Sequence, residues 1–162
     1  RAVALNIHAV CEKVCRLAQS EFADGIDWQL DYDVRVPQVR GVADYLQQLL
    51  RNLMQNAGQA VLREPTVHPK VILRTRIARN CLVNQVTYPM MLEISVIDNG
   101  PGVPDEIYDT LFLPMVTQRE GGTGLGLSVA MQIAQQHGGT IEVHSRAGRT
   151  QMRVLLPIVP NT

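Results

Sequence analysis

The sequence predicts an α+β domain, a two-layer sandwich in which a mixed sheet is covered on one face by about three helices. Two observations predict this fold. Three long segments carry apolar residues at helical spacing, and about five shorter ones alternate apolar with polar residues or are rich in β-branched side chains. The 162 residues are expected to form one domain, residues 1–162, which is long enough to bury a core without a disulfide or a metal.

The first half of the chain is expected to alternate between helix and strand. Residues 6–22 predict an amphipathic helix with Asn6 as its N-cap, and residues 26–32 alternate as a half-buried strand does. A second helix is expected over residues 42–62, because its leucines and alanines repeat every three or four positions. The prolines at positions 65 and 69 end that pattern.

The second half predicts two antiparallel pairs of strands around one more helix. Strands over residues 70–78 and 90–97 are expected to form a hairpin with a loose tip, followed by a short helical piece at 105–111. A helix over residues 125–136 ends at His137, with glycine available for the C-cap and a partial positive charge favourable there. Strands 140–145 and 151–156 close the fold around the Ala147-Gly148 turn.

Composition excludes several classes of function. Fifteen basic residues balance fifteen acidic ones and aromatic residues are only 4% of the chain, so no direct nucleic-acid partner is expected. No apolar run approaches the roughly 18 residues that cross a bilayer, and no signal peptide is present. Three cysteines fit a cytoplasmic protein. Cys11 and Cys15 could join His8 in a metal site, but buried core cysteines are the favoured interpretation.

Two asparagines on the second predicted helix are the first candidate functional residues. Asn52 and Asn56 are four residues apart, so their side chains leave the same face, beside the apolar stripe. A neutral amide oxygen can ligate Mg²⁺, a hard cation that keeps several waters and binds substrate phosphates. The alternative is that both asparagines are simply solvated.

An aspartate follows the β-branched strand that ends near residue 97. Asp98 precedes Gly100 and Gly102, a pattern that is also typical of a simple turn. The functional interpretation is that its carboxylate accepts a hydrogen bond from the exocyclic amine of adenine. Guanine presents a carbonyl at that position and would be rejected. The glycines would let the backbone approach the base.

A glycine-rich segment opens the third long helix. Residues 121–126 contain four glycines, and free N–H groups at a helix N-terminus make an anion site. No Gly-Lys-Ser/Thr closes the segment, and no strand leads directly into it, so it is neither a Walker A loop nor a dinucleotide fingerprint. A plain surface loop is the alternative.

Taken jointly and in this order, these segments resemble the ATP-binding domain shared by sensor histidine kinases, DNA gyrase, Hsp90 and MutL. The resemblance spans about residues 44 to 158 and rests on four motifs: Asn52-x-x-x-Asn56 (N box), Asp98-x-Gly100-x-Gly102 (first glycine box), Phe112-Leu113-Pro114 (F box) and residues 122–127 (second glycine box). Residues 109–116 with 119–122 are most similar to nitrogen-regulation sensor kinases of the NtrB type. The resemblance implies a Bergerat-type fold that binds ATP and Mg²⁺.

Residue roles follow from the resemblance. Asn56 would ligate Mg²⁺, Asn52 would lie near the triphosphate, Asp98 would recognise adenine, and Gly100 and Gly102 would shape the base pocket. The phosphates would be lined by residues of the second glycine box, namely Gly122, Thr123, Gly124, Leu125, Gly126 and Leu127. Residues 103–123 would form a mobile lid. Its Arg119 is, with Asn52, a candidate catalytic residue that stabilises the γ-phosphate, and a solvated arginine is the equal alternative.

Two positions depart from the family pattern. Met115 stands where many histidine kinases have a second phenylalanine in the F box, and Gln59 stands where many relatives carry a basic residue. In the ATPase relatives, a water-activating glutamate occupies the position of Asn52. An amide cannot act as a general base near neutral pH, so a kinase is favoured over a gyrase- or Hsp90-like ATPase. A degenerate nucleotide-binding module is the other alternative.

The acceptor histidine is expected outside this chain. None of the four histidines, His8, His68, His137 and His144, has the His-Glu-x-x-x-Pro context of a phospho-acceptor helix. The chain begins at Arg1, so we expect the C-terminal fragment of a longer sensor kinase whose upstream dimerisation domain carries the acceptor. The resemblance further implies a response regulator, of the nitrogen-type transcription activators, and a PII-type signal protein as partners.

Overall fold

A computed structural model describes residues 1–22, 24–63, 68–113 and 126–158 of the chain. The strands are β1 (Val3–Leu5), β2 (Asp27–Asp31), β3 (Val39–Gly41), β4 (Lys70–Val83), β5 (Val86–Asp98), β6 (Thr140–Arg146) and β7 (Arg149–Pro157). The helices are α1 (Ile7–Glu21), α2 (Ala43–Arg63), α3 (Asp105–Tyr108) and α4 (Gly126–Gln136). The predicted order of long helices and main strands is therefore confirmed.

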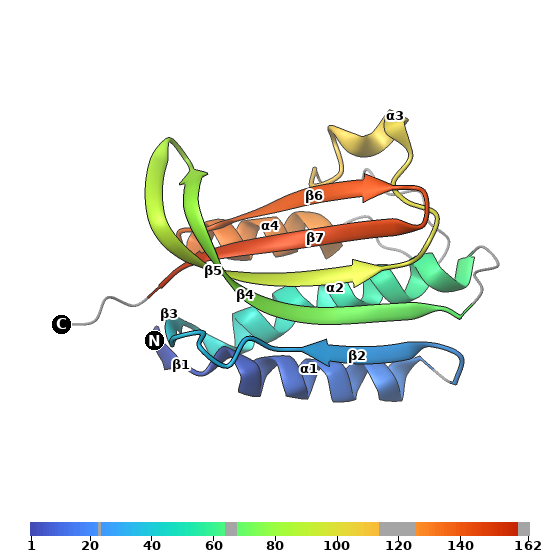
Figure 1. Cartoon of the computed structure of the whole chain (residues 1–162), viewed down its shortest axis with the longest axis horizontal. Coiled ribbons are helices and arrows are strands. Elements are labelled where there is room, and N and C mark those ends of the chain that lie inside the picture. The colour runs from blue at the N-terminus through green and yellow to red at the C-terminus, as the bar shows by residue number, and fades with distance from the viewer. Residues whose placement is uncertain (23, 64–67, 114–125, 159–162) are drawn as a thin grey trace.

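Five strands form one mixed sheet in the order β2-β4-β5-β7-β6. Only β2 and β4 run parallel, and the other neighbours are antiparallel. Figure 1 shows α1, α2 and α4 on one side of this sheet. Helices α2 and α4 touch the central strands, and α1 packs against α2. The expected α+β sandwich with three helices on one face is thus the observed fold.

The core lies between the sheet and these helices. It is built from alternate strand residues, such as Leu73, Ile94 and Val154, and from the apolar stripe of α2, which includes Leu49 and Leu53. Alternation along the strands sends every second side chain into this layer. At the N-terminus of α1, the Asn6 Oδ1 accepts the His8 N–H at 3.0 Å, which confirms the predicted N-cap.

The hairpin of β4 and β5 is longer and its turn tighter than expected. The strands pair as far as Val83 and Val86, and only Asn84 and Gln85 connect them, with φ values of 52° and 66°. Two successive left-handed residues make the primed turn that suits strand twist. Asn80, which lies in the expected loose tip, belongs to β4 and has φ 54°. A second small cluster packs where the hairpin extends beyond the main core: Ala78, Cys81, Val83, Met91 and Leu155.

Strands β1 and β3 are additions to the predicted elements. They pair antiparallel with each other in a separate two-stranded sheet and contain three residues each. A three-residue segment is too short for alternation to be recognised, so only the pairing of distant segments reveals them. Helix α3 is also shorter than expected, since it ends at Tyr108 instead of residue 111.

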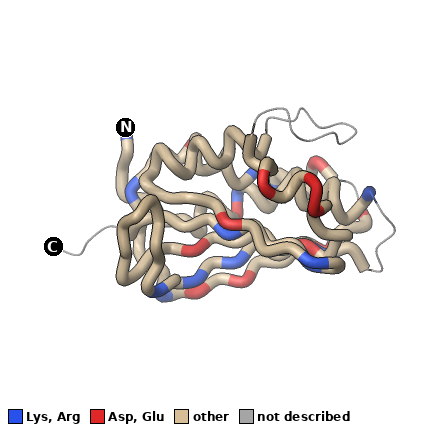
Figure 2. The backbone as a smooth tube through the Cα atoms, turned by 90° about the horizontal axis from the view of Figure 1, so that it is seen from above, with Lys and Arg blue, Asp and Glu red and all other residues tan. Residues whose placement is uncertain are grey.

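The centre of the sheet face that points away from α2 and α4 is polar, and we call this face the open face. Its central positions are Arg74, Glu93, Ser95 and Arg153. Figure 2 shows basic and acidic positions interspersed over the described chain, as the balanced composition predicts. No described helix is both long and apolar enough to span a membrane.

Candidate functional site

The predicted adenine-binding aspartate is buried at the end of a central strand. Asp98 is the last residue of β5 and only 4% exposed. The Gly100 N–H donates to its Oδ1 at 2.9 Å, so the chain turns back onto the carboxylate immediately after the strand. This bond fixes the orientation of the carboxylate before any ligand arrives.

Both glycines of the first predicted box have little room for a side chain. A Cβ on Gly100 would stand 3.2 Å from the carbonyl of Ala60 on α2 and 3.0 Å from the Asp98 Oδ1. Gly102 has φ +94°, and a Cβ there would stand 2.7 Å from the Arg146 carbonyl oxygen. The loop is therefore pressed between α2 and the turn of the β6–β7 hairpin, and larger residues would push it outward.

Asn99, between the aspartate and the first glycine, has a structural role. Its Oδ1 accepts the Lys70 N–H at 2.8 Å, and its Nδ2 donates to the His68 carbonyl at 2.9 Å. The Asn99 N–H also donates to the Lys70 carbonyl at 3.3 Å. These bonds tie the end of β5 to the start of β4 and so hold the position of Asp98.

The two asparagines of the predicted N box lie on α2 as expected. Asn52 Nδ2 donates to the Gly126 carbonyl at 3.0 Å, so Asn52 holds the first turn of α4. Ala60, eight residues further along α2, touches the loop at Gly100. Because residues four apart share a helix face, Asn56 lies between these two contacts. Helix α2 therefore joins the loop after Asp98 to the N-terminus of α4.

The described end of the second predicted glycine box is the start of α4. Among the described residues, the nearest neighbour of a Cβ added at Gly126 would be the Asn52 Cβ, at 4.0 Å. The Leu127 side chain is 7% exposed and belongs to the core, which leaves its backbone for any ligand contact. The predicted residues Arg119, Gly122, Thr123, Gly124 and Leu125 lie outside the described residues.

Two buried or half-buried polar residues near Asp98 escape prediction from the sequence. Thr150 is the register partner of Asp98 on β7 and is 4% exposed. Its hydroxyl lies 3.1 Å from the Ser145 Oγ, which also accepts the Val103 N–H at 2.8 Å. This chain of bonds fastens the loop after Asp98 to the β6–β7 hairpin. Only the strand register, which the sequence does not state, brings Thr150 next to the aspartate.

His137 links α4 to α2 as a neutral ring. Its Nδ1 lies 2.8 Å from the Ile133 carbonyl, which can only accept, and its Nε2 lies 3.1 Å from the Val42 N–H, which can only donate. These partners select the tautomer with the proton on Nδ1. His137 contacts the helix C-terminus, as expected. Gly41 makes room, since a Cβ there would stand 2.9 Å from the ring.

The suggested grouping of His8, Cys11 and Cys15 is not a metal site. His8 Nε2 bonds the Thr75 hydroxyl at 2.7 Å, and its ring stacks on Tyr32 with centroids 4.1 Å apart. Burial raises the pKa of the Cys11 thiol to about 12, so it stays protonated. Among the described residues, no three His, Cys, Asp or Glu side chains are grouped to hold a metal. The favoured interpretation of these cysteines as core residues is confirmed.

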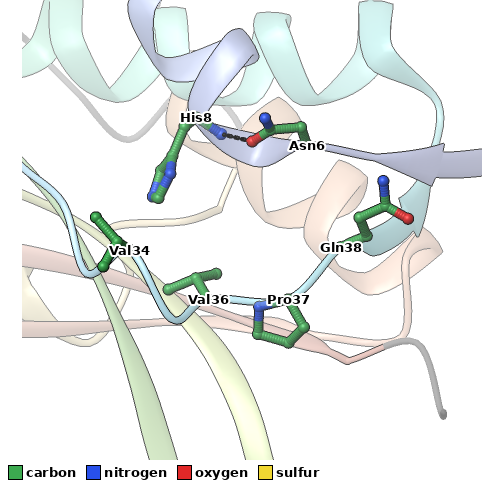
Figure 3. Close-up of a pocket in the computed structure, with 6 residues that line it drawn as sticks. All are labelled: Asn6, His8, Val34, Val36, Pro37 and Gln38. Carbon is green, nitrogen blue, oxygen red and sulfur yellow. Dashed lines mark hydrogen bonds between the residues drawn. The ribbon is translucent and has the colours of Figure 1, made fainter.

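A pocket of about 210 Å³ lies beside the N-terminus of α1, and its lining residues are drawn in Figure 3. Its lining is Asn6, His8, Val34, Val36, Pro37 and Gln38. Desolvation lowers the pKa of His8, which favours its neutral form. Asn6 is used as the helix cap, so the pocket offers a ligand neither a fixed charge nor a free cap group. It does not compete with the Asp98 region as a candidate site.

Comparison with known proteins gives a consistent picture. The family model described as "Histidine kinase-, DNA gyrase B-, and HSP90-like ATPase" matches residues 41–160. The chain is 43% identical over 153 residues to the sensory histidine kinase/phosphatase NtrB of Klebsiella oxytoca, covering 94% of this chain and 43% of that protein. It is 39% identical to the NtrB of Rhizobium leguminosarum bv. phaseoli, covering 97% and 42% respectively. The chain thus spans less than half the length of these relatives.

Solved structures share the fold. The nucleotide-free catalytic domain of the histidine kinase ThkA superposes with a TM-score of 0.78 at 24% identity, covering 97% of this chain and 95% of that one. Full-length ShkA in complex with AMPPNP superposes with a TM-score of 0.77 at 21% identity, covering 99% of this chain and 32% of that one. At these identities the likeness establishes the architecture alone.

Proposed function

Because the chain belongs to the histidine kinase-, DNA gyrase B- and HSP90-like ATPase family, we propose that it is the ATP-binding catalytic domain of an NtrB-type sensor histidine kinase. In this proposal it binds ATP with Mg²⁺ and delivers the γ-phosphoryl group to a histidine on another domain. The observation that carries it is the buried, pre-oriented Asp98 carboxylate, joined through α2 to the N-terminus of α4.

Adenine recognition is assigned to the end of β5. The Asp98 carboxylate is a strong acceptor in a site shielded from water, where a hydrogen bond from the adenine amine counts more than in solvent. Gly100 and Gly102 let the backbone lie close to this carboxylate. A Cβ added at either glycine would stand within about 3 Å of a backbone or side-chain oxygen atom. A guanine carbonyl facing this carboxylate would leave two acceptors opposed, so the site favours ATP over GTP.

The metal and the triphosphate are assigned to the region between α2 and α4. Asn56 supplies an amide oxygen, the hard ligand type that Mg²⁺ accepts, while nucleotide phosphates and waters would complete its shell. The first turn of α4, held by Asn52, directs its backbone N–H groups and positive dipole end outward. The bound metal would neutralise phosphate charge during transfer. The remaining phosphate contacts are proposed for Gly122, Thr123, Gly124, Leu125 and Arg119 on the strength of the family resemblance.

Kinase activity is preferred over hydrolysis because of Asn52. Its side chain is an amide, and its Nδ2 is engaged with the Gly126 carbonyl, so it cannot remove a proton from water. A histidine kinase needs no such base in this domain, since the nucleophile is an imidazole supplied by another domain. Two histidines of this chain, His8 and His137, are poor acceptors by contrast, because the ring of each is held by hydrogen bonds.

We further propose that residues 1–162 form one domain of a longer cytoplasmic kinase. The curated relatives are more than twice as long as the matched region and are named sensory histidine kinase/phosphatase. A dimerisation domain with the acceptor histidine, a response regulator of the nitrogen-type transcription activators and a PII-type signal protein are the partners that this likeness supports. All three described cysteines are free and buried, which suits a reducing compartment.

A calorimetric titration with ATP, with and without Mg²⁺, tests the proposal. We expect saturable, Mg²⁺-dependent binding without continuing heat flow. Asp98→Asn should weaken ATP binding at least about tenfold, since a charged acceptor is lost, whereas the control Asp27→Asn, on the exposed edge strand, should bind as the parent does. Asn56→Ala should remove the Mg²⁺ dependence.

Two outcomes would redirect the assignment. Sustained heat from turnover would favour a gyrase- or Hsp90-like ATPase. No binding heat at either of two temperatures would favour a degenerate module. Transfer itself is tested by adding radiolabelled ATP and a separately purified NtrB dimerisation domain, and a histidine left unlabelled by a chain that binds ATP would contradict the kinase assignment.

A further inference from the structure

We propose that the pocket between α3 and the β6–β7 turn binds a small oxyanion, of the size of phosphate, at a site separate from the nucleotide. The pocket has a volume of about 260 Å³ and is lined by Tyr108, His144, Ser145, Arg146 and Arg149. Nothing in the proposed kinase mechanism uses these residues. The proposal therefore stands on contacts of its own and does not depend on ATP binding.

The two arginines occupy an unfavourable arrangement if nothing binds there. Arg146 and Arg149 are direct register partners at the end of the hairpin, so their side chains leave the same face of the ribbon. Like charges directly opposite each other destabilise a strand pair. No salt bridge joins either one to a carboxylate among the described residues. An anion between them would turn this repulsion into binding.

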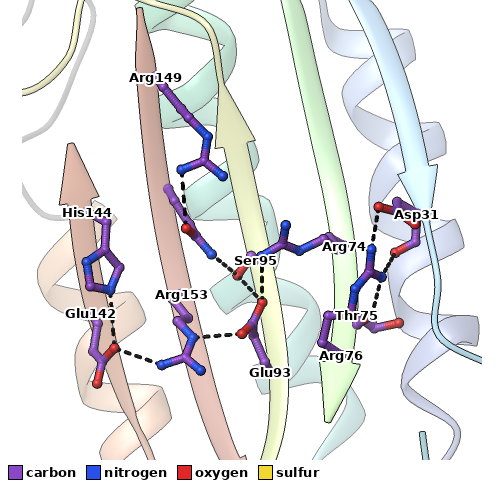
Figure 4. Close-up of polar contacts among 11 residues, drawn as sticks. Asp31, Arg74, Thr75, Arg76, Glu93, Ser95, Glu142, His144, Arg149 and Arg153 are labelled. Atoms are coloured by element: carbon purple, nitrogen blue, oxygen red, sulfur yellow. Dashed lines mark hydrogen bonds and ion pairs between the residues drawn. The ribbon is translucent and has the colours of Figure 1, made fainter. Parts of the chain in front are cut away.

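The carboxylates of the neighbouring strands on the open face are already engaged. Glu142 accepts from Arg153 at 3.0 Å and lies 3.3 Å from His144. Glu93, further along the open face, is held by Arg153 and Arg74. Figure 4 shows this network, with Arg149 at its upper end. Among the described residues, the Arg149 side chain has one hydrogen bond, a long one at 3.4 Å to the neutral Gln151 amide oxygen. Arg146 and Arg149 at the turn therefore have no carboxylate partner among the paired carboxylates of the open face.

The chemistry and size of the pocket select the ligand. Guanidinium groups bind phosphate and carboxylate oxygens through paired N–H donors. Organic cofactors and drug-sized ligands occupy roughly 300–1,000 Å³, so this smaller pocket suits an oxyanion better than a nucleotide. On one side, α3 is anchored by the Tyr108 hydroxyl, which donates to the Val143 carbonyl. That bond fixes the wall opposite the two arginines.

The pocket is distinct from the Asp98 region but connected to it. Asp98 and Thr150 belong to the strand positions that alternate toward the helices, whereas His144 and Arg149 are drawn on the open face in Figure 4. A Cβ on Gly102 would stand only 2.7 Å from the Arg146 carbonyl oxygen, and the Ser145 hydroxyl accepts the Val103 N–H. An anion that orders the turn would therefore also touch the loop that follows the aspartate.

Titration with inorganic phosphate, followed by amide NMR of the chain at constant ionic strength, tests the site. We expect saturable shifts at Tyr108 and at residues 144–149. The double variant Arg146→Gln/Arg149→Gln should weaken binding by about tenfold or more, because two charged donors are removed. Arg149→Lys, which keeps the charge but loses the paired donors, should bind with intermediate affinity. The matched control Arg79→Gln, an exposed arginine on β4, should bind as the parent does.

Three results would overturn the proposal. One is the absence of saturable shifts, and another is an unchanged affinity in the double variant with a native amide spectrum. The third is that the shifts gather at the start of α4 and vanish when ATP is added, which would place the phosphate in the nucleotide site. If the double variant fails to fold, the phosphate affinities of Arg149→Lys and Arg79→Gln are compared instead. Equal affinities of these two variants would then contradict the proposal.

Discussion

The two faces of the sheet are stabilised by different interactions, apolar packing on one and ion pairs on the other, although the same strands build both. Glu93 and Ile94 are consecutive on β5, and both are buried, at 5% and 1% exposure. Ile94 points into the apolar layer under α2 and α4. Glu93 points to the open face, where its two oxygens meet Arg153 and Arg74. Burial alone therefore does not tell which kind of interaction a strand position contributes.

The open-face network satisfies its buried carboxylate fully. Arg153 Nε donates to one Glu93 oxygen at 2.7 Å, while Arg74 and Ser95 donate to the other at 3.1 and 3.0 Å. Gln151 Nε2 in turn donates to the Ser95 Oγ at 3.0 Å. A buried charge is tolerable only with such partners, because its desolvation is otherwise uncompensated. Apolar side chains of the helical face such as Ile94 need no such partners, since they carry no charge to satisfy.

The largest expected effect lies on the helical face. Ile94→Ala should destabilise the fold by about 4 kcal/mol, because it removes buried methyl groups and leaves a cavity under α2. Urea unfolding measures this loss, with Leu82→Ala as the control, since Leu82 is 70% exposed. Equal effects of the two changes would mean that the layer between sheet and helices is not the main source of stability.

Glu93→Gln should have the next largest effect, about 2 kcal/mol, because two arginines that are each about a quarter exposed lose their charged partner. The side chain keeps its shape, so the loss reports on charge and hydrogen bonding instead of packing. Asp31→Asn is the matched control. Its pair with Arg76 is half exposed and should contribute less than about 1 kcal/mol. A Glu93 variant no weaker than the control would show that the network contributes little.

Gly102→Ala should destabilise the fold by about 2 kcal/mol. The substitution changes the loop that links Asp98 on the helical face to the β6–β7 turn. The residue has φ +94°, and its new Cβ would press on the Arg146 carbonyl at 2.7 Å. Gly126→Ala is the control, since the nearest described atom to its Cβ is 4.0 Å away. Thermal unfolding gives both losses, and ATP titration shows whether the displaced loop also disturbs Asp98. Equal stability of the two variants would mean that the loop yields without strain.

The sequence predicts the helical face better than the open face for a physical reason. The core stripe of α2, the strand leading to Asp98 and the pair Asn52 and Asn56 are all local patterns, with periods of a few residues. The Glu93 network depends on cross-strand neighbours from β4 and β7, some 20 and 60 positions away. Thr150 next to Asp98 and the β1–β3 pair depend on register in the same way.

The smallest expected effect is the pH dependence of the open face. Burial alone would raise the pKa of Glu93, but hydrogen bonds from Arg153, Arg74 and Ser95 outweigh it, so the pKa lies below its ordinary value of 4.5. A carboxyl whose pKa is lowered by folding stabilises the protein fully above the pKa of the unfolded chain, and this stabilisation is lost as the pH falls through the folded value.

Between pH 7 and pH 5 the stability difference between the parent and Glu93→Gln should thus be constant. Below about pH 4.5 it should shrink, because the unfolded chain then binds a proton that the folded protein resists. Urea midpoints of both proteins across this range measure the difference, and one that stays constant down to pH 3 would place the pKa of Glu93 elsewhere. The Ile94→Ala difference should show no such change with pH, because no titrating group is removed from the helical face.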